Sequence, residues 1–173
     1  MAAGHAPVEI ELIPGFRDLP PAVEDGATFD ENAVKKAMHY APYAPGFLFA
    51  DDSGLEVDAL GGAPGVYSAR FAGPAATDEA NNRLLLEKLS GVANRTARFV
   101  CAIALVNAGH TRGIYRGAVE GRILDSPRGS GGFGYDPLFF YEPFGCTFGE
   151  ATDEQKFSAS HRGQALRAML AAL

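Results

Sequence analysis

The stretch Phe47-Leu-Phe-Ala-Asp-Asp-Ser-Gly54 runs from an apolar segment directly into two carboxylates and a turn signal. The apolar residues 47–50 are typical of a short buried strand. Open α/β sheets place their ligand-binding groups at the carboxyl ends of such strands. We therefore expect the strand to end near Asp51 and to present Asp51 and Asp52 at a functional edge of a sheet.

The segments on either side alternate between helical and strand patterns. Residues 28–41 begin with a Thr28/Glu31 capping box and carry apolar side chains at helical spacing, which predicts an amphipathic helix. Residues 98–106 form a nearly continuous apolar run, as expected for a central strand covered on both faces. Further strands are expected at 8–13, 113–124 and 138–141, and further helices at 77–91 and 160–173. The sequence thus predicts an α/β fold, with an elongated mixed sheet flanked by helices.

Length and charge limit the classes of function. The chain has 173 residues, which predicts one domain, 1–173, with two lobes. Its net charge of −6 argues against general binding to nucleic acid or to anionic membranes. An anionic small substrate would need local lysines, arginines or a metal ion. No apolar run approaches the ~20 residues of a membrane helix, and residues 1–7 lack the features of a secretion signal, so we expect a cytoplasmic protein.

Asp51 and Asp52 form the first candidate site. Adjacent carboxylates repel each other, which raises the cost of ionising both unless a cation lies between them. Mg²⁺ suits such a pair, because it takes one or two carboxylates together with phosphate oxygens and water. The alternative is a plain turn in which aspartate caps and Gly54 supplies a positive φ.

Charged residues around the first predicted helix are the second group. Lys36 could reach a phosphate as a mobile point charge. Glu24 lies just before the helix and is a candidate metal-binding carboxylate. Glu31 and Lys35 also have a structural interpretation, as a capping residue and a solvated partner.

A glycine-rich segment, residues 130–137, is the third candidate. Its glycines would let the backbone approach a ligand closely. Phe133 and Tyr135 offer flat faces on which a purine could stack, and Asp136 precedes a stiffening proline. The alternative is a hairpin turn with core aromatics.

Residues 156–163 are the fourth candidate. Ser160 is a plausible N-cap, which places His161 and Arg162 in the first turn of the last helix, where backbone N–H groups favour oxygen acceptors. Such donors suit a purine with a keto group at position 6 and leave adenine badly paired, a mismatch that can discriminate on the order of 10⁴-fold. The alternative is that Arg162 forms a surface ion pair and His161 only caps.

Four blocks together resemble the inosine/xanthosine triphosphate pyrophosphatases: residues 26–33, 50–70, 131–137 and 160–166. The resemblance runs from about residue 8 to the end. It implies a two-lobed α/β fold with a nucleotide cleft between the lobes, and usually a homodimer. It also implies Mg²⁺-dependent hydrolysis of ITP, dITP and XTP to the monophosphate and pyrophosphate.

The resemblance implies a role for each matching residue. Asp52 corresponds to the catalytic aspartate, which holds the metal and orients or deprotonates the attacking water, and Glu24 is the nearest candidate for a second metal ligand, beside Asp51. Lys36 corresponds to a helix lysine near the phosphates. Residues that contact substrate, sugar or base correspond to Ser53, Phe133, Gly134, Tyr135, Asp136, Lys156, His161 and Arg162.

One part of the family pattern is not found in the sequence. Relatives open with a strand and a Thr-x-Asn-x-x-Lys loop that cradles the triphosphate, followed by a first helix. We therefore expect a truncated form that is folded and dimeric but catalytically weak. The alternatives are a catalytically impaired purine-nucleotide-binding protein and a related pyrophosphatase acting on another nucleotide.

Overall fold

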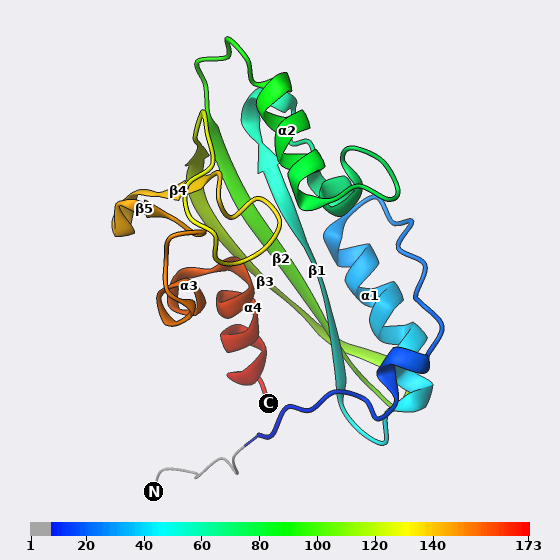
Figure 1. Cartoon of the computed structure of the whole chain (residues 1–173). Coiled ribbons are helices and arrows are strands. Elements are labelled where there is room, and N and C mark those ends of the chain that lie inside the picture. The colour runs from blue at the N-terminus through cyan, green and yellow to red at the C-terminus, as the bar shows by residue number, and fades with distance from the viewer. Residues whose placement is uncertain (1–7) are drawn as a thin grey trace, which may run out of the picture.

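The computed structural model describes residues 8–173, so the prediction that residues 1–7 lack a secretion signal lies outside the described residues. The centre is a five-stranded sheet with strand order β1-β2-β3-β4-β5 (Figure 1). The strands are β1 (Leu48–Val57), β2 (Thr96–Asn107), β3 (His110–Ile123), β4 (Phe139–Tyr141) and β5 (Cys146–Thr147). The α-helices are α1 (Phe29–Tyr40), α2 (Asp78–Lys88), α3 (Asp153–Ala159) and α4 (His161–Leu170).

The α/β class is confirmed, and helices flank a long sheet. Each strand pairing within residues 8–173 is antiparallel, where a mixed sheet was expected. The physical reason is connectivity. Each strand pairs with the strand that follows it in the chain, and the chain reverses its direction between the two. The long strands β2 and β3, for example, form a hairpin through Ala108 (φ 50°) and Gly109 (φ 73°). Two successive residues with positive φ are typical of the tight turns that join antiparallel strands.

Helices α1 and α4 cover opposite faces of the sheet (Figure 1). Alternate residues of β2 divide between them. Ala102, Ala104 and Val106 pack with α1, whereas Cys101, Ile103 and Leu105 pack with α4. This division explains the nearly continuous apolar run at 98–106, because neither face of the central strand meets water. The prediction of a central strand covered on both faces is confirmed.

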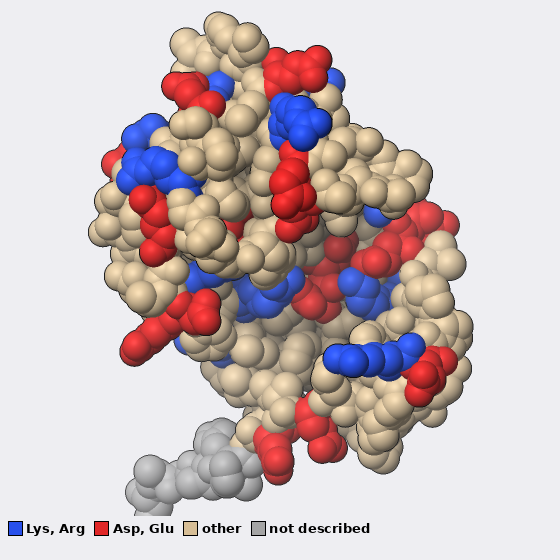
Figure 2. Space-filling view, viewed as in Figure 1, with Lys and Arg blue, Asp and Glu red and all other residues tan. Residues whose placement is uncertain are grey.

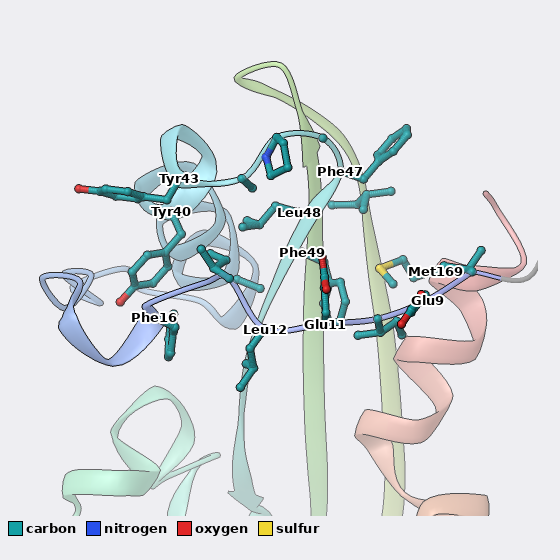
Figure 3. Close-up of a pocket in the computed structure, with 18 of the residues that line it drawn as sticks. Glu9, Glu11, Leu12, Phe16, Tyr40, Tyr43, Phe47, Leu48, Phe49 and Met169 are labelled. Atoms are coloured by element: carbon teal, nitrogen blue, oxygen red, sulfur yellow. The ribbon is translucent and has the colours of Figure 1, made fainter.

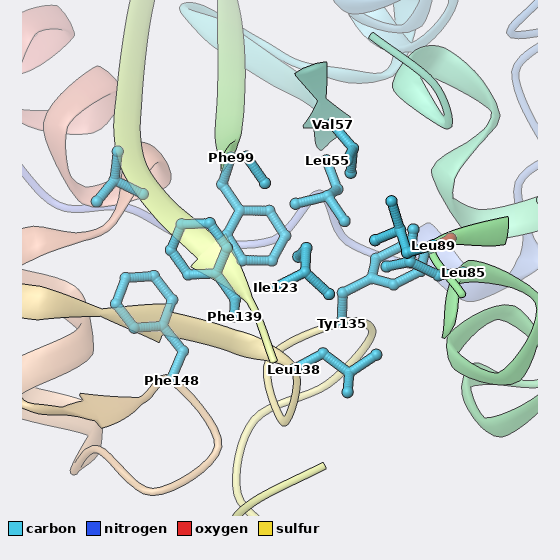
Figure 4. Close-up of a cluster of buried hydrophobic side chains, with 12 residues drawn as sticks. Leu55, Val57, Leu85, Leu89, Phe99, Ile123, Tyr135, Leu138, Phe139 and Phe148 are labelled. Atoms are coloured by element: carbon cyan, nitrogen blue, oxygen red, sulfur yellow. The ribbon is translucent and has the colours of Figure 1, made fainter. Parts of the chain in front are cut away.

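A third cluster fills the other end of the sheet, where α2 packs (Figure 4). Leu85 and Leu89 contribute from the α2 region, and Phe99 lies against Phe139 with ring centroids 4.5 Å apart. Tyr135 also belongs to this cluster. The glycine-rich segment is therefore anchored in this cluster through Tyr135.

Two strand predictions differ from the structure. Residues 8–13 have no strand hydrogen bonds and instead line a cavity of about 580 Å³, together with Phe16, Tyr40 and the start of β1 (Figure 3). The strand prediction rested on the alternation of apolar and acidic residues. Alternation alone does not form a strand, because a strand also needs a neighbouring strand for its backbone hydrogen bonds. Strand β1, in contrast, does not end at Ala50 but continues to Val57, since its pairing with β2 is uninterrupted.

None of the helices in residues 8–173 is both long enough and apolar enough to cross a bilayer.

Candidate active site

The site begins with Asp52, which lies in the middle of β1 opposite Ala102 of β2. Its side chain faces α1, where Lys36 and Glu24 form an ion pair with Nζ and Oε1 2.5 Å apart. Lys36 Nζ also donates a hydrogen bond to the Asp51 carbonyl oxygen, over 2.9 Å. The Lys36 side chain of α1 thus contacts both strand β1 and the loop that precedes the helix.

Asn32 holds that loop in place. It is almost completely buried, and its Oδ1 accepts a hydrogen bond from the Gly26 backbone N–H over 2.7 Å. A side chain at Gly26 would collide with Asn32 Oδ1, since a Cβ there would lie 2.7 Å from it. This close approach fixes the position of Glu24. The only signal for Asn32 in the sequence was its spacing of four residues from Lys36, on the same helical face.

Asp52 carries an oxygen without a partner. Oδ1 accepts a hydrogen bond from the Ser53 backbone N–H over 3.1 Å, whereas Oδ2 is buried and has no partner among the described residues. Burial raises the pKa of Asp52, and the nearby Glu24 carboxylate also raises it, while Asn32 and Lys36 act in the opposite direction. A buried carboxylate oxygen in this state favours either a proton or a cation.

The donors around Asp52 fit a divalent cation such as Mg²⁺. Asp52 and Glu24 offer hard carboxylate oxygens, and Mg²⁺ is usually held by one or two carboxylates, with water and substrate phosphates completing the shell. Within residues 8–173 no group of three or more His, Cys, Asp or Glu side chains could enclose a metal without help. This arrangement suits a metal that arrives with a phosphate ligand better than a closed structural site.

Asp51 lies on the other face of β1. Its Oδ2 accepts a hydrogen bond from Arg162 Nε over 2.9 Å, on the α4 side of the sheet. Neighbouring residues of a strand point to opposite faces, so Asp51 and Asp52 are separated by the strand itself. The expected arrangement, in which one cation sits between two adjacent carboxylates at the end of a strand, is therefore not formed, because the Asp-Asp-Ser-Gly motif is strand rather than turn.

The glycine-rich segment presents Phe133 but not Tyr135. Phe133 is 61% exposed, with Lys156 Nζ 4.5 Å and Arg162 Cζ 5.6 Å from its ring centroid. Tyr135 is buried, and its hydroxyl donates a hydrogen bond to the Ser68 carbonyl oxygen over 2.7 Å. Burial also raises the pKa of Tyr135. Phe133 can therefore offer a stacking face to a base, whereas Tyr135 anchors the loop in the core.

Asp136 organises this loop from inside. It is 3% exposed, and its carboxylate accepts hydrogen bonds from the Phe133 backbone N–H and from Lys156 Nζ. From outside, Asp78 of α2 accepts a hydrogen bond from the Gly134 N–H over 2.7 Å. The sequence analysis did not select Asp78, because an aspartate that follows a threonine N-cap is common at the start of helices and needs no functional explanation.

His161 occupies the first position of α4 and is 7% exposed. Its ring stacks on Phe99 with centroids 4.9 Å apart, and its Nδ1 is buried without a partner among the described residues. Burial, with a smaller contribution from Arg162, lowers the pKa of His161 to about 3. The imidazole is therefore neutral at physiological pH, with one N–H donor and one acceptor.

The structure thus divides the predicted residues between two faces of one strand. Glu24, Lys36 and Asp52 meet on the α1 side, and the α4 side brings together Asp51, Ser53, Phe133, Asp136, Lys156, His161 and Arg162. Figure 2 shows acidic and basic side chains side by side in the hollow that crosses the middle of the molecule. The hollow combines carboxylate oxygens with N–H donors, which suits a ligand that has both phosphates and a polar ring.

Comparisons with known proteins agree with this arrangement. The sequence matches the model of the Ham1 family over residues 2–172. It is 54% identical to a dITP/XTP pyrophosphatase of Syntrophobacter fumaroxidans over 94% of this chain and 70% of that relative. It is 55% identical to a dITP/XTP pyrophosphatase of an Exiguobacterium species over 92% of this chain and 81% of that relative.

Solved structures agree as well. The Staphylococcus aureus Ham1 protein superposes with a TM-score of 0.84 at 42% identity, covering 91% of this chain and 82% of that chain. A HAM1 protein from Coxiella burnetii gives a TM-score of 0.82 at 42% identity, with 88% and 79% covered. With the match extending over nearly the whole sequence and the fold shared, this chain belongs to the Ham1 family.

Proposed function

We propose that this chain hydrolyses the non-canonical purine nucleoside triphosphates ITP, dITP and XTP to the monophosphate and pyrophosphate, and so clears them from the nucleotide pool. The relatives named dITP/XTP pyrophosphatase support an enzyme that acts on nucleoside triphosphates. The observation that carries the proposal here is the unpartnered, buried Oδ2 of Asp52 beside Glu24 and Lys36.

Glu24 and Asp52 would hold Mg²⁺, which when bound supplies charge neutralisation to the triphosphate and acidity to a bound water. Asp52 Oδ2 orients the attacking water and accepts its proton, a role favoured by the raised pKa of this carboxyl. Lys36 lies within 2.9 Å of the backbone of the same strand, so its ammonium group stays next to the reaction site. There it stabilises the negative charge that develops on the phosphate oxygens.

The opposite side of the strand would hold the base and sugar. Phe133 provides an exposed ring for stacking, and Arg162 and His161 provide N–H donors toward a keto oxygen. An adenine base brings an amino donor to the same position, which leaves donors facing donors. This mismatch is the physical basis for the proposed preference for inosine and xanthosine nucleotides over ATP.

The test is release of pyrophosphate from ITP, dITP, XTP, ATP and dUTP by the purified chain with Mg²⁺. The proposal expects turnover of the first three, little with ATP, and loss of turnover with EDTA. Turnover of dUTP alone would favour a pyrophosphatase of another specificity. Binding of IMP in a calorimeter without turnover of any triphosphate would favour a nucleotide-binding protein. We further propose a cytoplasmic homodimer, for which light scattering at micromolar concentration should give twice the mass of one chain.

A further inference from the structure

We propose that Asp51 is a positioning residue for base recognition, which aims the guanidinium of Arg162 at the purine, and that it is not a metal ligand. The proposal rests on the proposed function, because it assigns a role within the same nucleotide site. It departs from the expectation from sequence, in which Asp51 and Asp52 shared a cation.

Arg162 is fixed at two points on one strand. Its Nε donates to Asp51 Oδ2 over 2.9 Å, and its Nη2 donates to Ser53 Oγ over 3.1 Å. Residues 51 and 53 lie on the same face of β1, because side chains two positions apart in a strand point the same way. Two anchors on a planar group fix both the position and the tilt of its plane.

The anchoring leaves donors free where a base would lie. Among the hydrogen bonds of residues 8–173, none uses Nη1 of Arg162. The guanidinium lies over the exposed ring of Phe133, with Cζ 5.6 Å from the ring centroid. A purine stacked on Phe133 would bring its polar edge next to these N–H groups. A keto oxygen accepts from them, whereas the amino group of adenine offers hydrogens of its own.

The side-chain contacts of the Asp51 carboxylate lie on the α4 side and use Oδ2. Cys101 Sγ lies 3.9 Å from the same Oδ2 as a weak donor, and the strand separates this carboxylate from Asp52. A cation at Asp51 would therefore lie on the α4 face beside the Arg162 guanidinium, on the opposite face of the strand from Asp52. The geometry therefore assigns Asp51 to the base and Asp52 to the metal.

The experiment is calorimetric titration of the purified chain with IMP and with AMP in EDTA, so that neither turnover nor metal contributes. Asp51→Ala removes the anchor, and Asp51→Asn keeps an acceptor for Arg162. We expect IMP affinity to fall about tenfold in Asp51→Ala and less in Asp51→Asn, with AMP affinity unchanged, as suits a half-exposed charged hydrogen bond. Glu56→Ala is the matched control, since Glu56 lies on the same strand and pairs with Arg98 at 3.7 Å, away from the base.

A second set of variants guards against loss of structure. Arg162→Lys keeps the charge but loses both anchors and the N–H groups that face the base, so its IMP affinity should fall at least as far as that of Asp51→Ala. The double variant Asp51→Ala/Arg162→Lys should bind IMP no worse than Arg162→Lys alone, because Asp51 acts only through Arg162. Additive losses would overturn the proposal.

Other results would contradict either the positioning role of Asp51 or the proposed function. Equal weakening of IMP and AMP, or wild-type affinity for IMP in Asp51→Ala, would overturn the positioning role. A variant with unchanged IMP affinity but a raised Mg²⁺ requirement for pyrophosphate release would restore Asp51 as a metal ligand. If the wild-type chain neither binds IMP nor cleaves any triphosphate, the proposed function itself fails, and that result differs from every result above.

Discussion

Asp52 carries its carboxylate in the middle of β1, where burial raises its pKa. Its raised pKa shows that burial opposes the charge, so the ionised form makes the folded state less stable than the protonated form does. The sign follows from linkage: a raised pKa contributes stability at low pH, and that contribution is lost as the pH rises. The proposed Mg²⁺ would offset this loss by pairing with the carboxylate.

Asp52→Asn tests both consequences of this charge. Turnover should fall by about 10²–10⁴-fold, since the proton acceptor is lost. The melting temperature at pH 7 should rise, because a neutral amide is easier to bury than an ion. Pyrophosphate release and thermal unfolding measure the two effects. Asp58→Asn, a change beside Arg98, is the control and should leave turnover near that of the wild type. Unchanged turnover in Asp52→Asn would contradict the role.

His161 should make the protein sensitive to acid. In the folded state its pKa is lowered to about 3, while the unfolded chain protonates near 6.5. The unfolded state therefore binds the proton first as the pH falls, and the free energy of unfolding drops between pH 6.5 and 3 by up to ~1.4 kcal/mol per pH unit.

His161→Asn should flatten this dependence, which urea unfolding at a series of pH values would measure. His110→Gln, a change at an exposed imidazole, is the control and should keep the slope of the wild type. Equal slopes for His161→Asn and the wild type would show that His161 is not the group responsible.

At the scale of elements, the first and last helices were well predicted, and α3 was not. Residues 28–41 were expected as a helix, and α1 spans Phe29–Tyr40. Thr28 caps it as expected, but the Glu31 carboxylate accepts from the Ala27 N–H instead of the Thr28 N–H. The short helix α3 was not predicted, because its seven residues show no apolar stripe and none of them is buried.

The contact of α4 with the sheet depends on Gly117 of β3. A Cβ at this position would lie 2.1 Å from the His161 carbonyl oxygen and 2.8 Å from the Ala165 nitrogen. These are backbone atoms, so only a displacement of the helix could make room. Because His161 and Arg162 lie in the first turn of α4, the displacement would also move the donors of the proposed base site.

Gly117→Ala should therefore reduce the free energy of unfolding by about 1–3 kcal/mol, as overpacking generally does. It should also weaken IMP binding in the same preparation. Urea unfolding and calorimetry provide the two readings. Gly46→Ala is the matched control, since a Cβ there meets nothing within 4 Å. Wild-type stability in Gly117→Ala would show that α4 can shift without loss.

At the scale of the whole molecule, β1 connects the two halves of the site. Its side chains alternate between the α1 face, with Asp52 as the proposed metal ligand, and the α4 face, with Asp51 and Ser53 beside the proposed base donors. A triphosphate that engages both halves must be held by both helices, whereas a monophosphate needs chiefly the α4 side. Binding of the triphosphate should therefore stabilise the fold only when the metal is present, whereas stabilisation by the monophosphate should not depend on the metal.

This difference can be measured by thermal unfolding. IMP should raise the melting temperature equally with Mg²⁺ or EDTA, while an ITP analogue with a methylene group between the α and β phosphates should act strongly only with Mg²⁺. At a hundredfold excess over the dissociation constant, binding stabilises by about 2.7 kcal/mol. ATP is the control and should do little. An ITP analogue that stabilises equally in EDTA would argue against metal-assisted phosphate binding.

The sequence by itself determined the α/β class, the first helix, the buried central strand and the family, because apolar periodicity and short motifs are local properties of the chain. It did not determine whether the Asp-Asp-Ser-Gly motif lies in a turn at the end of a strand or inside the strand. Only the tertiary structure decided that β1 runs through it, since strand pairing with β2 depends on residues 50 positions away. That pairing sends Asp51 to Arg162 and Asp52 toward Lys36, and so separates two carboxylates that the sequence places side by side.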